Sequence, residues 1–176
     1  TSSTRPASPY DGQVIYETDT KKTLVYNGSA WAILSDVGAW ASYTPVLTAS
    51  TTDPTLGSGS TQSGYYCQFG KIVFYRFYIA FGTSGVNAGS GTYRISLPVN
   101  ASGTGGAGPT TVGSMFIFDS STSNGHTGLM GNVANSTYIT DIYYAQGTSL
   151  AAVTNSAPFT WAASDQIRGS LIYEAS

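Results

Sequence analysis

Clusters of Gly, Ser, Thr and Asn interrupt this sequence at short intervals, and their spacing constrains the fold more than any other feature. The segments between the clusters are short and rich in apolar residues, and none shows a helical period of useful length. Short segments separated by turn-forming residues are typical of β-sandwiches and jelly rolls. The sequence therefore predicts an all-β protein.

Most of these segments lie in residues 37–176, which we predict to form an antiparallel, jelly-roll-like β-sandwich of about eight strands. The predicted strands are Tyr43–Leu47, Gly64–Phe69, Ile72–Phe81, Thr92–Pro98, Val112–Phe118, Gly128–Val133, Tyr138–Tyr144 and Gln166–Tyr173. The polar segments Ser50–Ser63, Gly82–Gly91 and Gly147–Ser156 are predicted to be loops, and Gly70-Lys71 a tight turn.

Residues 1–36 differ from the rest of the chain in charge. They hold seven charged residues, whereas residues 37–176 hold the other nine. We therefore predict two domains, residues 1–36 and 37–176, with a boundary near Ser35–Trp40. The first is predicted to be a β-meander, with an Asn27-Gly28 turn before its last strand. Its three predicted strands are Gln13–Thr18, Thr23–Tyr26 and Ala30–Leu34. Three short strands are marginally stable alone, so we expect the meander to pack against copies of itself or against the next domain.

The predicted strand Ile72–Phe81 is largely apolar on both faces. A sheet with one wetted face alternates apolar and polar residues, so one face here should fill the core and the other needs a second cover. We expect a neighbouring subunit to provide that cover, although a long loop would serve as well. The predicted trimer-interface residues are Ile72, Phe74, Arg76, Tyr78 and Trp31. At an interface Arg76 would need a carboxylate or carbonyl partner.

Charge is scarce in this chain, at 9% of residues against about 25% in a typical soluble domain. A monomer usually carries more charge to stay dispersed, so we expect much of the surface to face other subunits. The Lys and Arg residues are scattered, which argues against a nucleic-acid partner. No apolar run approaches the roughly 18 residues of a membrane span, so we expect no membrane insertion.

Residues suited to catalysis are few. The single histidine, His126, is predicted to lie in an exposed loop, and the single cysteine, Cys67, to be a small core residue in a strand. A glycosidase needs two carboxylates at a set separation. Asp119, Asp141 and Asp165 are predicted at strand ends or in loops, where Asp favours turns, and no motif brings two of them together. We predict no enzymatic activity, no metal site and no cofactor.

Aromatic residues are better candidates for a binding site than these residues are for a catalytic one. Tyr and Trp flanked by Ser, Asn and Gly suit adaptable recognition surfaces. Tyr143, Tyr144, Phe159 and Trp161 flank the polar segment 147–156, and they are the candidate receptor-binding residues, as a site that stacks on sugars. The alternative is that these rings fill the core or a contact between subunits.

Two stretches of the sequence resemble tail proteins of phages. Residues 5–20 follow the pattern R-P-x-x-P-x-x-G-x-x-I/V-Y-x-x-D-T, and a hydrophobic strand, an Asn-Gly turn and Trp31 come after it. This arrangement resembles a module of phage minor tail and tail fibre proteins. The segments Trp40–Thr48, Gly64–Phe74 and Gly91–Val99 are similar to the C-terminal domain that often follows that module, particularly in phages that infect actinobacteria.

The resemblance implies a homotrimeric virion component and carries no catalytic motif. We expect a tail or fibre tip domain on the extracellular particle, which attaches to the host by receptor binding. Its expected partners are two further copies of the chain, other virion proteins, and a glycan or protein of the bacterial surface. Two alternatives stay open, namely a head fibre or capsid decoration protein and a polysaccharide depolymerase.

Overall fold

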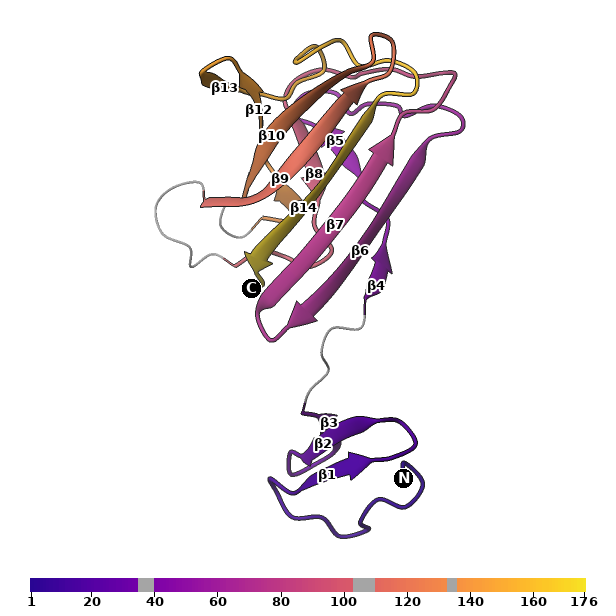
Figure 1. The fold of residues 1–176 in the computed structure, drawn as a ribbon, viewed down its shortest axis with the longest axis vertical. Coiled ribbons are helices and arrows are strands. Elements are labelled where there is room, and N and C mark those ends of the chain that lie inside the picture. Colours follow the sequence, from indigo (N-terminus) through magenta and orange to yellow (C-terminus); the bar gives the residue numbers. More distant parts are fainter. Residues whose placement is uncertain (35–39, 103–109, 133–135) are drawn as a thin grey trace. The chain divides into compact units, whose positions relative to one another are not determined.

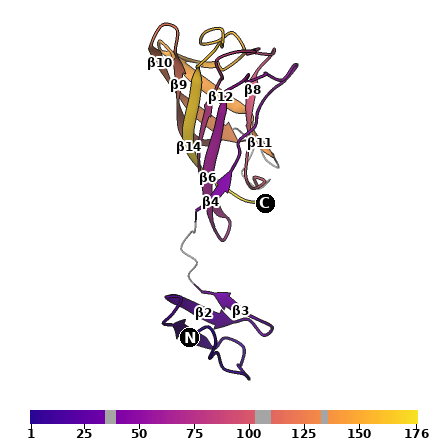
Figure 2. The same cartoon turned by 90° about the vertical axis from the view of Figure 1, so that its right-hand side faces the viewer.

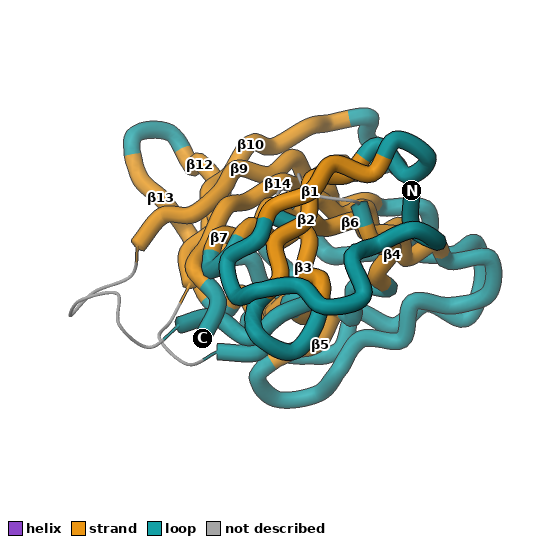
Figure 3. Tube along the Cα trace, turned by 90° about the horizontal axis from the view of Figure 1, so that it is seen from below, coloured by secondary structure: helices purple, strands orange, loops and turns teal. Residues whose placement is uncertain are grey.

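The computed structural model describes residues 1–34, 40–102, 110–132 and 136–176. The chain forms two compact units, Thr1–Ala39 and Trp40–Ser176, and the predicted boundary near Ser35–Trp40 lies largely outside the described residues. Every strand pair in the described residues is antiparallel, and these residues contain strands and loops but no helix (Figures 1 and 3). None of them forms a long apolar helix that would cross a membrane. The prediction of an all-β, antiparallel protein is confirmed.

The first unit is a β-meander of three strands in the order β1-β2-β3, as predicted. The strands are β1 (Val14–Glu17), β2 (Lys22–Tyr26) and β3 (Trp31–Ile33). The predicted turn before β3 depends on Asn27, whose Oδ1 accepts hydrogen bonds from the backbone N–H groups of Ser29 and Ala30. Gly28 provides the positive φ of +89°. A side chain therefore closes this turn in addition to the backbone.

The first unit buries few apolar side chains. Leu24 is buried, and so is the carboxylate of Glu17, which accepts hydrogen bonds from Arg5 Nε and Thr20 Oγ1. Trp31 is half-buried, with its ring 5.5 Å from that of Tyr26. Four apolar side chains of the unit, Tyr10, Val14, Tyr16 and Leu34, are more than half exposed. A sheet with so small a core gains little free energy from burial, so side-chain hydrogen bonds matter more to its stability.

We expect acid to unfold the first unit through Asp19. The backbone N–H and the hydroxyl of Ser2 both donate to this carboxylate, which lowers the pKa of Asp19 from 3.8 to about 2. The ionised form therefore stabilises the fold; this stabilisation is complete above the unfolded pKa and is lost as the pH falls towards the folded pKa. The indole N–H resonance of Trp31 should move to its unfolded position between about pH 4 and pH 2.

The Asp19→Asn variant is the control for this titration. Its Trp31 resonance should already show partial unfolding at neutral pH and change less on acidification, because the ionised hydrogen-bond acceptor is gone. A parent protein whose Trp31 resonance is unchanged down to pH 2 would contradict the prediction.

The second unit is a sandwich of two unequal sheets (Figure 2). The larger sheet has eight strands in the order β13-β12-β10-β9-β14-β7-β6-β4, and the smaller has three in the order β11-β8-β5. The strands are β4 (Ala41–Tyr43), β5 (Leu47–Ala49), β6 (Thr61–Phe69), β7 (Ile72–Ala80), β8 (Tyr93–Ser96), β9 (Thr110–Asp119), β10 (Asn124–Asn132), β11 (Tyr138–Ile139), β12 (Asp141–Gln146), β13 (Ser149–Ala152) and β14 (Gln166–Glu174). Buried side chains of β7 and β8, among them Val73, Ile79, Tyr93 and Ile95, form the core. The predicted sandwich is confirmed.

Two predicted strands have wrong bounds because the chain passes from one sheet to the other within each of them. Tyr43–Leu47 contains the link from β4 in the larger sheet to β5 in the smaller, and Pro45 within it has no N–H for a ladder. Tyr138–Tyr144 is likewise divided between β11 and β12, which belong to different sheets. β13 lies in the predicted loop Gly147–Ser156, and the predicted end of a strand at Val133 lies outside the described residues.

Two predictions for single residues also need correction. His126 lies in β10 and not in a loop, with its half-buried ring 5.9 Å from Tyr144 and 5.8 Å from Phe159. Cys67 lies in β6 as expected, but it is half-buried rather than in the core. Gly70, with a φ of +54°, makes the predicted tight turn between β6 and β7.

The polar segments 50–60 and 82–92 pair with each other, although both were predicted to be loops. Backbone bridges join Thr52 with Ser90, Thr55 with Asn87, and Ser58 with Ser84. Gly57 and Gly89 have positive φ, and a Cβ would lie 2.4 Å from the Ser84 carbonyl oxygen at the first and 2.2 Å from that of Thr52 at the second. Both positions therefore require glycine. We call this paired structure the polar ribbon; Leu56, Val86 and Ala88 anchor it on the core.

Candidate functional site

The side chains of the larger sheet that point away from the core form a surface that we call the outer face. In β7, Val73, Tyr75 and the following odd-numbered residues are buried against the smaller sheet. The even-numbered residues point the other way, and Ile72 and Phe74 are 50% and 39% exposed. No described loop covers this face, which removes the loop alternative for the described part of the chain.

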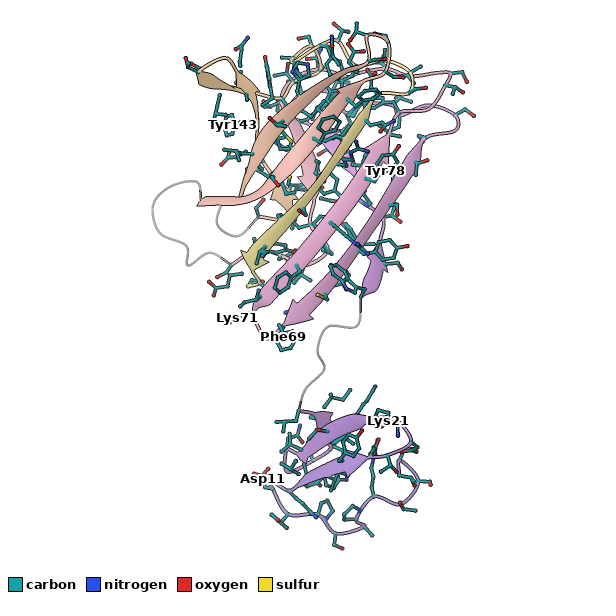
Figure 4. The ribbon with its side chains drawn as sticks, in the orientation of Figure 1. Asp11, Lys21, Phe69, Lys71, Tyr78 and Tyr143 are labelled. Atoms are coloured by element: carbon teal, nitrogen blue, oxygen red, sulfur yellow. The ribbon has the colours of Figure 1, made fainter. Side chains whose placement is uncertain are left out.

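The outer face continues as an apolar surface over neighbouring strands. The exposed apolar side chains on its strands are Tyr65 and Phe69 of β6, Ile72 and Phe74 of β7, Leu129 of β10, Leu150 of β13, and Ile172 of β14. Figure 4 looks onto this side of the sheet and labels Phe69, Tyr78 and Tyr143. An open groove of about 510 Å³ crosses it, lined in part by Trp40, Arg76 and Ser170. An apolar surface of this extent is typical of an interaction site.

Arg76 lies within this apolar surface. Its guanidinium group stacks on two rings, 4.8 Å from the centroid of Trp40 and 5.4 Å from that of Tyr65. Among the described residues it has no hydrogen bond or ion pair. Arg168, on the same face, is 4.8 Å from the ring of Phe116. The rings orient these cations and leave their N–H groups free for an acceptor outside the chain.

The predicted interface residues of the second unit all lie on the outer face. Ile72, Phe74 and Arg76 are exposed and Tyr78 is half-buried. Trp31 belongs to the first unit. The contacts of Arg76 with Trp40 and Tyr65 were not predicted; the register of β6 on β7, which pairs Tyr65 with Arg76, is the feature that would have indicated one of them.

The candidate receptor-binding residues do not form an open aromatic surface. Tyr144 and Trp161 are 7% and 3% exposed, and both belong to the core. Trp161 Nε1 donates to the carbonyl of Thr154 at 2.9 Å, and its ring lies 5.1 Å from that of the half-buried Phe159. Tyr143, also half-buried, points to the outer face, away from the other three. The buried rings present no face to a sugar, so the prediction is wrong for Tyr144 and Trp161.

The three candidate carboxylates lie at or beside strand ends, as predicted; Asp119 and Asp165 lie close together, and Asp141 lies apart from them. Asp119 and Asp165 are both buried, and Asp165 joins two loops by accepting hydrogen bonds from the backbone N–H groups of Ser120 and Ala162, at 2.9 and 2.7 Å. Asp141 begins β12 on the outer face. No group of three possible metal ligands occurs in the described ranges.

The pKa values of the buried carboxylates diverge. Burial raises the pKa of Asp165, whereas hydrogen bonds from the hydroxyls of Ser121 and Thr122 lower that of Asp119. Divergent pKa values are also found in acid–base pairs of enzymes. Here Asp119 binds Ser121 and Thr122 of its own turn, whereas Asp165 binds Ser120 of that same turn as well as Ala162, and the nearby charge of Asp119 also raises the pKa of Asp165. A structural role in holding the two loops together accounts for these hydrogen bonds.

Comparisons with known proteins give one match. No family model matches the chain, and no curated protein matches it. The crystal structure of the Dettilon tailspike protein aligns with 76% of this chain, at 25% sequence identity and a TM-score of 0.46. The aligned part is 23% of the tailspike chain. That TM-score is too low to establish a common fold.

Proposed function

We propose that the chain is part of a homotrimeric tail or fibre protein of a phage virion, where it is a non-enzymatic structural and attachment domain. The observation that carries this proposal is the open, apolar outer face. Ile72, Phe74 and Ile172 on it are each more than a third exposed. A second copy of the chain is the cover that the low charge of the surface favours.

The resemblance of residues 5–31 and of the segments 40–48, 64–74 and 91–99 to phage tail proteins supports the same assignment. A closed trimer would remove three outer faces from water at once and leave no open end for further association. In the first unit the exposed Val14 and Tyr16 would form a second contact between copies; the predicted interface residue Trp31 lies on the opposite face of the meander, beside Tyr26. A meander with so small a core would gain most of its stability from that contact.

Attachment to the host is proposed for the polar ribbon, in place of the buried aromatic residues. Its side chains Thr52, Thr55, Ser84 and Asn87 are exposed and carry hydrogen-bonding groups. Three ribbons on one trimer would bind a repetitive bacterial glycan or protein with avidity, so each contact can be weak.

We expect the purified protein to have about three times the 18.3 kDa chain mass in solution. Light scattering after size-exclusion chromatography measures this mass independently of shape. A stable monomer across the accessible concentration range would contradict the proposal.

Binding assays separate the proposal from its rivals. Binding to host cells supports attachment, whereas binding to capsids without binding to cells would indicate a head fibre or decoration protein. A purified protein that shortens host polysaccharide would indicate a depolymerase. In that case one or two of the variants Asp119→Asn, Asp141→Asn and Asp165→Asn should abolish cleavage, with circular dichroism to confirm folding.

A further inference from the structure

We infer that Arg76 of one copy binds the carboxylate of Asp141 in the next copy around the trimer. The inference rests on the proposed trimer and names the polar contact within its interface. It concerns two side chains on the outer face that have no hydrogen-bond or ion-pair partner among the described residues of their own chain.

Arg76 is the first of these groups. Its guanidinium lies beside Trp40, Tyr65 and the exposed Phe74, in the most apolar part of the outer face. If another copy covers this surface, water is removed from the charge, which is unfavourable unless an acceptor replaces the water. The two rings stack on the guanidinium plane and leave its edge N–H groups for that acceptor.

The carboxylates of the second unit differ in whether a hydrogen bond within the chain already occupies them. Asp53 accepts a hydrogen bond from the backbone of Ala49, Asp119 binds its own turn, and Asp165 binds the backbone of Ser120 and Ala162. The carboxylates of Asp141 and Glu174 have no hydrogen bond or ion pair with any described residue. Both lie on the outer face, so either is chemically able to meet Arg76 in a neighbouring copy.

The register of the sheet separates Arg76 and Asp141 within one chain. Paired positions run across the sheet from Arg76 through Ser170, Ser114 and Leu129 to Tyr143. Four steps between strands correspond to about 19 Å. Asp141 is two residues from Tyr143, which adds about 7 Å along β12. The two charges therefore cannot pair within a chain, yet they lie at similar heights on opposite sides of the outer face.

A cyclic trimer joins opposite sides of neighbouring copies. Its contacts are heterologous, so the β7 side of one outer face meets the β12 side of the next, and this repeats three times. That arrangement brings Arg76 to Asp141. Glu174 lies on β14, directly beside β7, and is about 13 Å along the strand from the position paired with Arg76. Glu174 would therefore face the β12 side of the neighbouring copy and not the Arg76 of that copy.

A charge exchange tests the contact. Arg76→Asp and Asp141→Arg, each alone, place like charges together and should raise the trimer dissociation constant at least about tenfold. The double variant Arg76→Asp/Asp141→Arg should return it to within about threefold of the parent, because the pair is restored with its polarity reversed. Sedimentation equilibrium measures the constants, and circular dichroism confirms that each variant is folded.

Two further double variants serve as controls. Arg76→Asp with Glu174→Arg should stay weakened, and so should Asp141→Arg with Arg94→Asp, since Arg94 lies in β8 of the smaller sheet. A trimeric parent whose charge exchange fails to restore the affinity would overturn this inference and leave the proposed function standing. Restoration by Glu174→Arg would overturn it in favour of Glu174. A monomeric parent would overturn both.

Discussion

Replacing Phe74 and Ile172 together with glutamate is expected to convert the proposed trimer into folded monomers. The two residues occupy paired positions on β7 and β14, and both are exposed in the single chain, at 39% and 53%. Carboxylates there stay hydrated in a monomer but would have to be buried without partners in the proposed contact, at a cost of several kcal/mol per charge. Light scattering should report the 18.3 kDa mass of one chain.

The Val46→Glu variant is the matched control for this experiment. Val46 is exposed to a similar degree, at 46%, but it lies in the link between β4 and β5 and not on the outer face. This variant should keep the mass of the parent. If the Phe74→Glu/Ile172→Glu protein also keeps that mass, the outer face is not the contact between copies.

Trp161→Ala is expected to lower the free energy of unfolding by about 3–5 kcal/mol. The indole ring is buried, lies 5.4 Å from the rings of both Phe81 and Tyr93, and donates its N–H to Thr154. Alanine would leave a cavity and would leave the Thr154 carbonyl with only the longer hydrogen bond from Ala157 N–H, at 3.4 Å. Urea unfolding measures the change, and the monomeric Phe74→Glu/Ile172→Glu background keeps subunit association out of the result.

Trp40→Ala in the same background is the comparison. Its ring is half exposed and contacts Arg76, so we expect a loss of no more than about 1 kcal/mol. The contrary result would be a Trp161→Ala protein that keeps its stability and loses its binding to host cells. That result would indicate that Trp161 contacts the receptor and would contradict its place in the core.

The sequence predicted local structure best where alternation or turn chemistry determines it. The two faces of β7, the turn at Gly70 and the positions of Asp119 and Asp165 at strand ends all follow from neighbouring residues. The division of Tyr138–Tyr144 between two sheets could not be predicted in this way. Residues on both sides of such a crossing have strand-forming side chains, and only the partner strands decide which sheet each joins.

The candidate site could be predicted only in part, because some of its contacts join residues that are far apart in the sequence. The even-numbered residues of β7 indicate an apolar second face without further information. The stacking of Arg76 on Trp40 and Tyr65 depends on the register of separate strands, which no local pattern reveals. The burial of Trp161 likewise depends on the distant residues Phe81 and Tyr93. Its polar neighbours in the sequence suggested exposure, but they belong to the loop that covers it.

The polar ribbon has a consequence for how such a protein changes over generations. Backbone bridges and two obligatory glycines, Gly57 and Gly89, determine its shape, while side chains such as Thr55 and Asn87 point outward. Mutations at the outward positions alter the chemistry presented to a bacterial surface without altering the scaffold that presents it. If the ribbon makes the proposed contact with the host, host range would drift through single substitutions in it, while the glycines and the anchoring residues beneath it stay fixed.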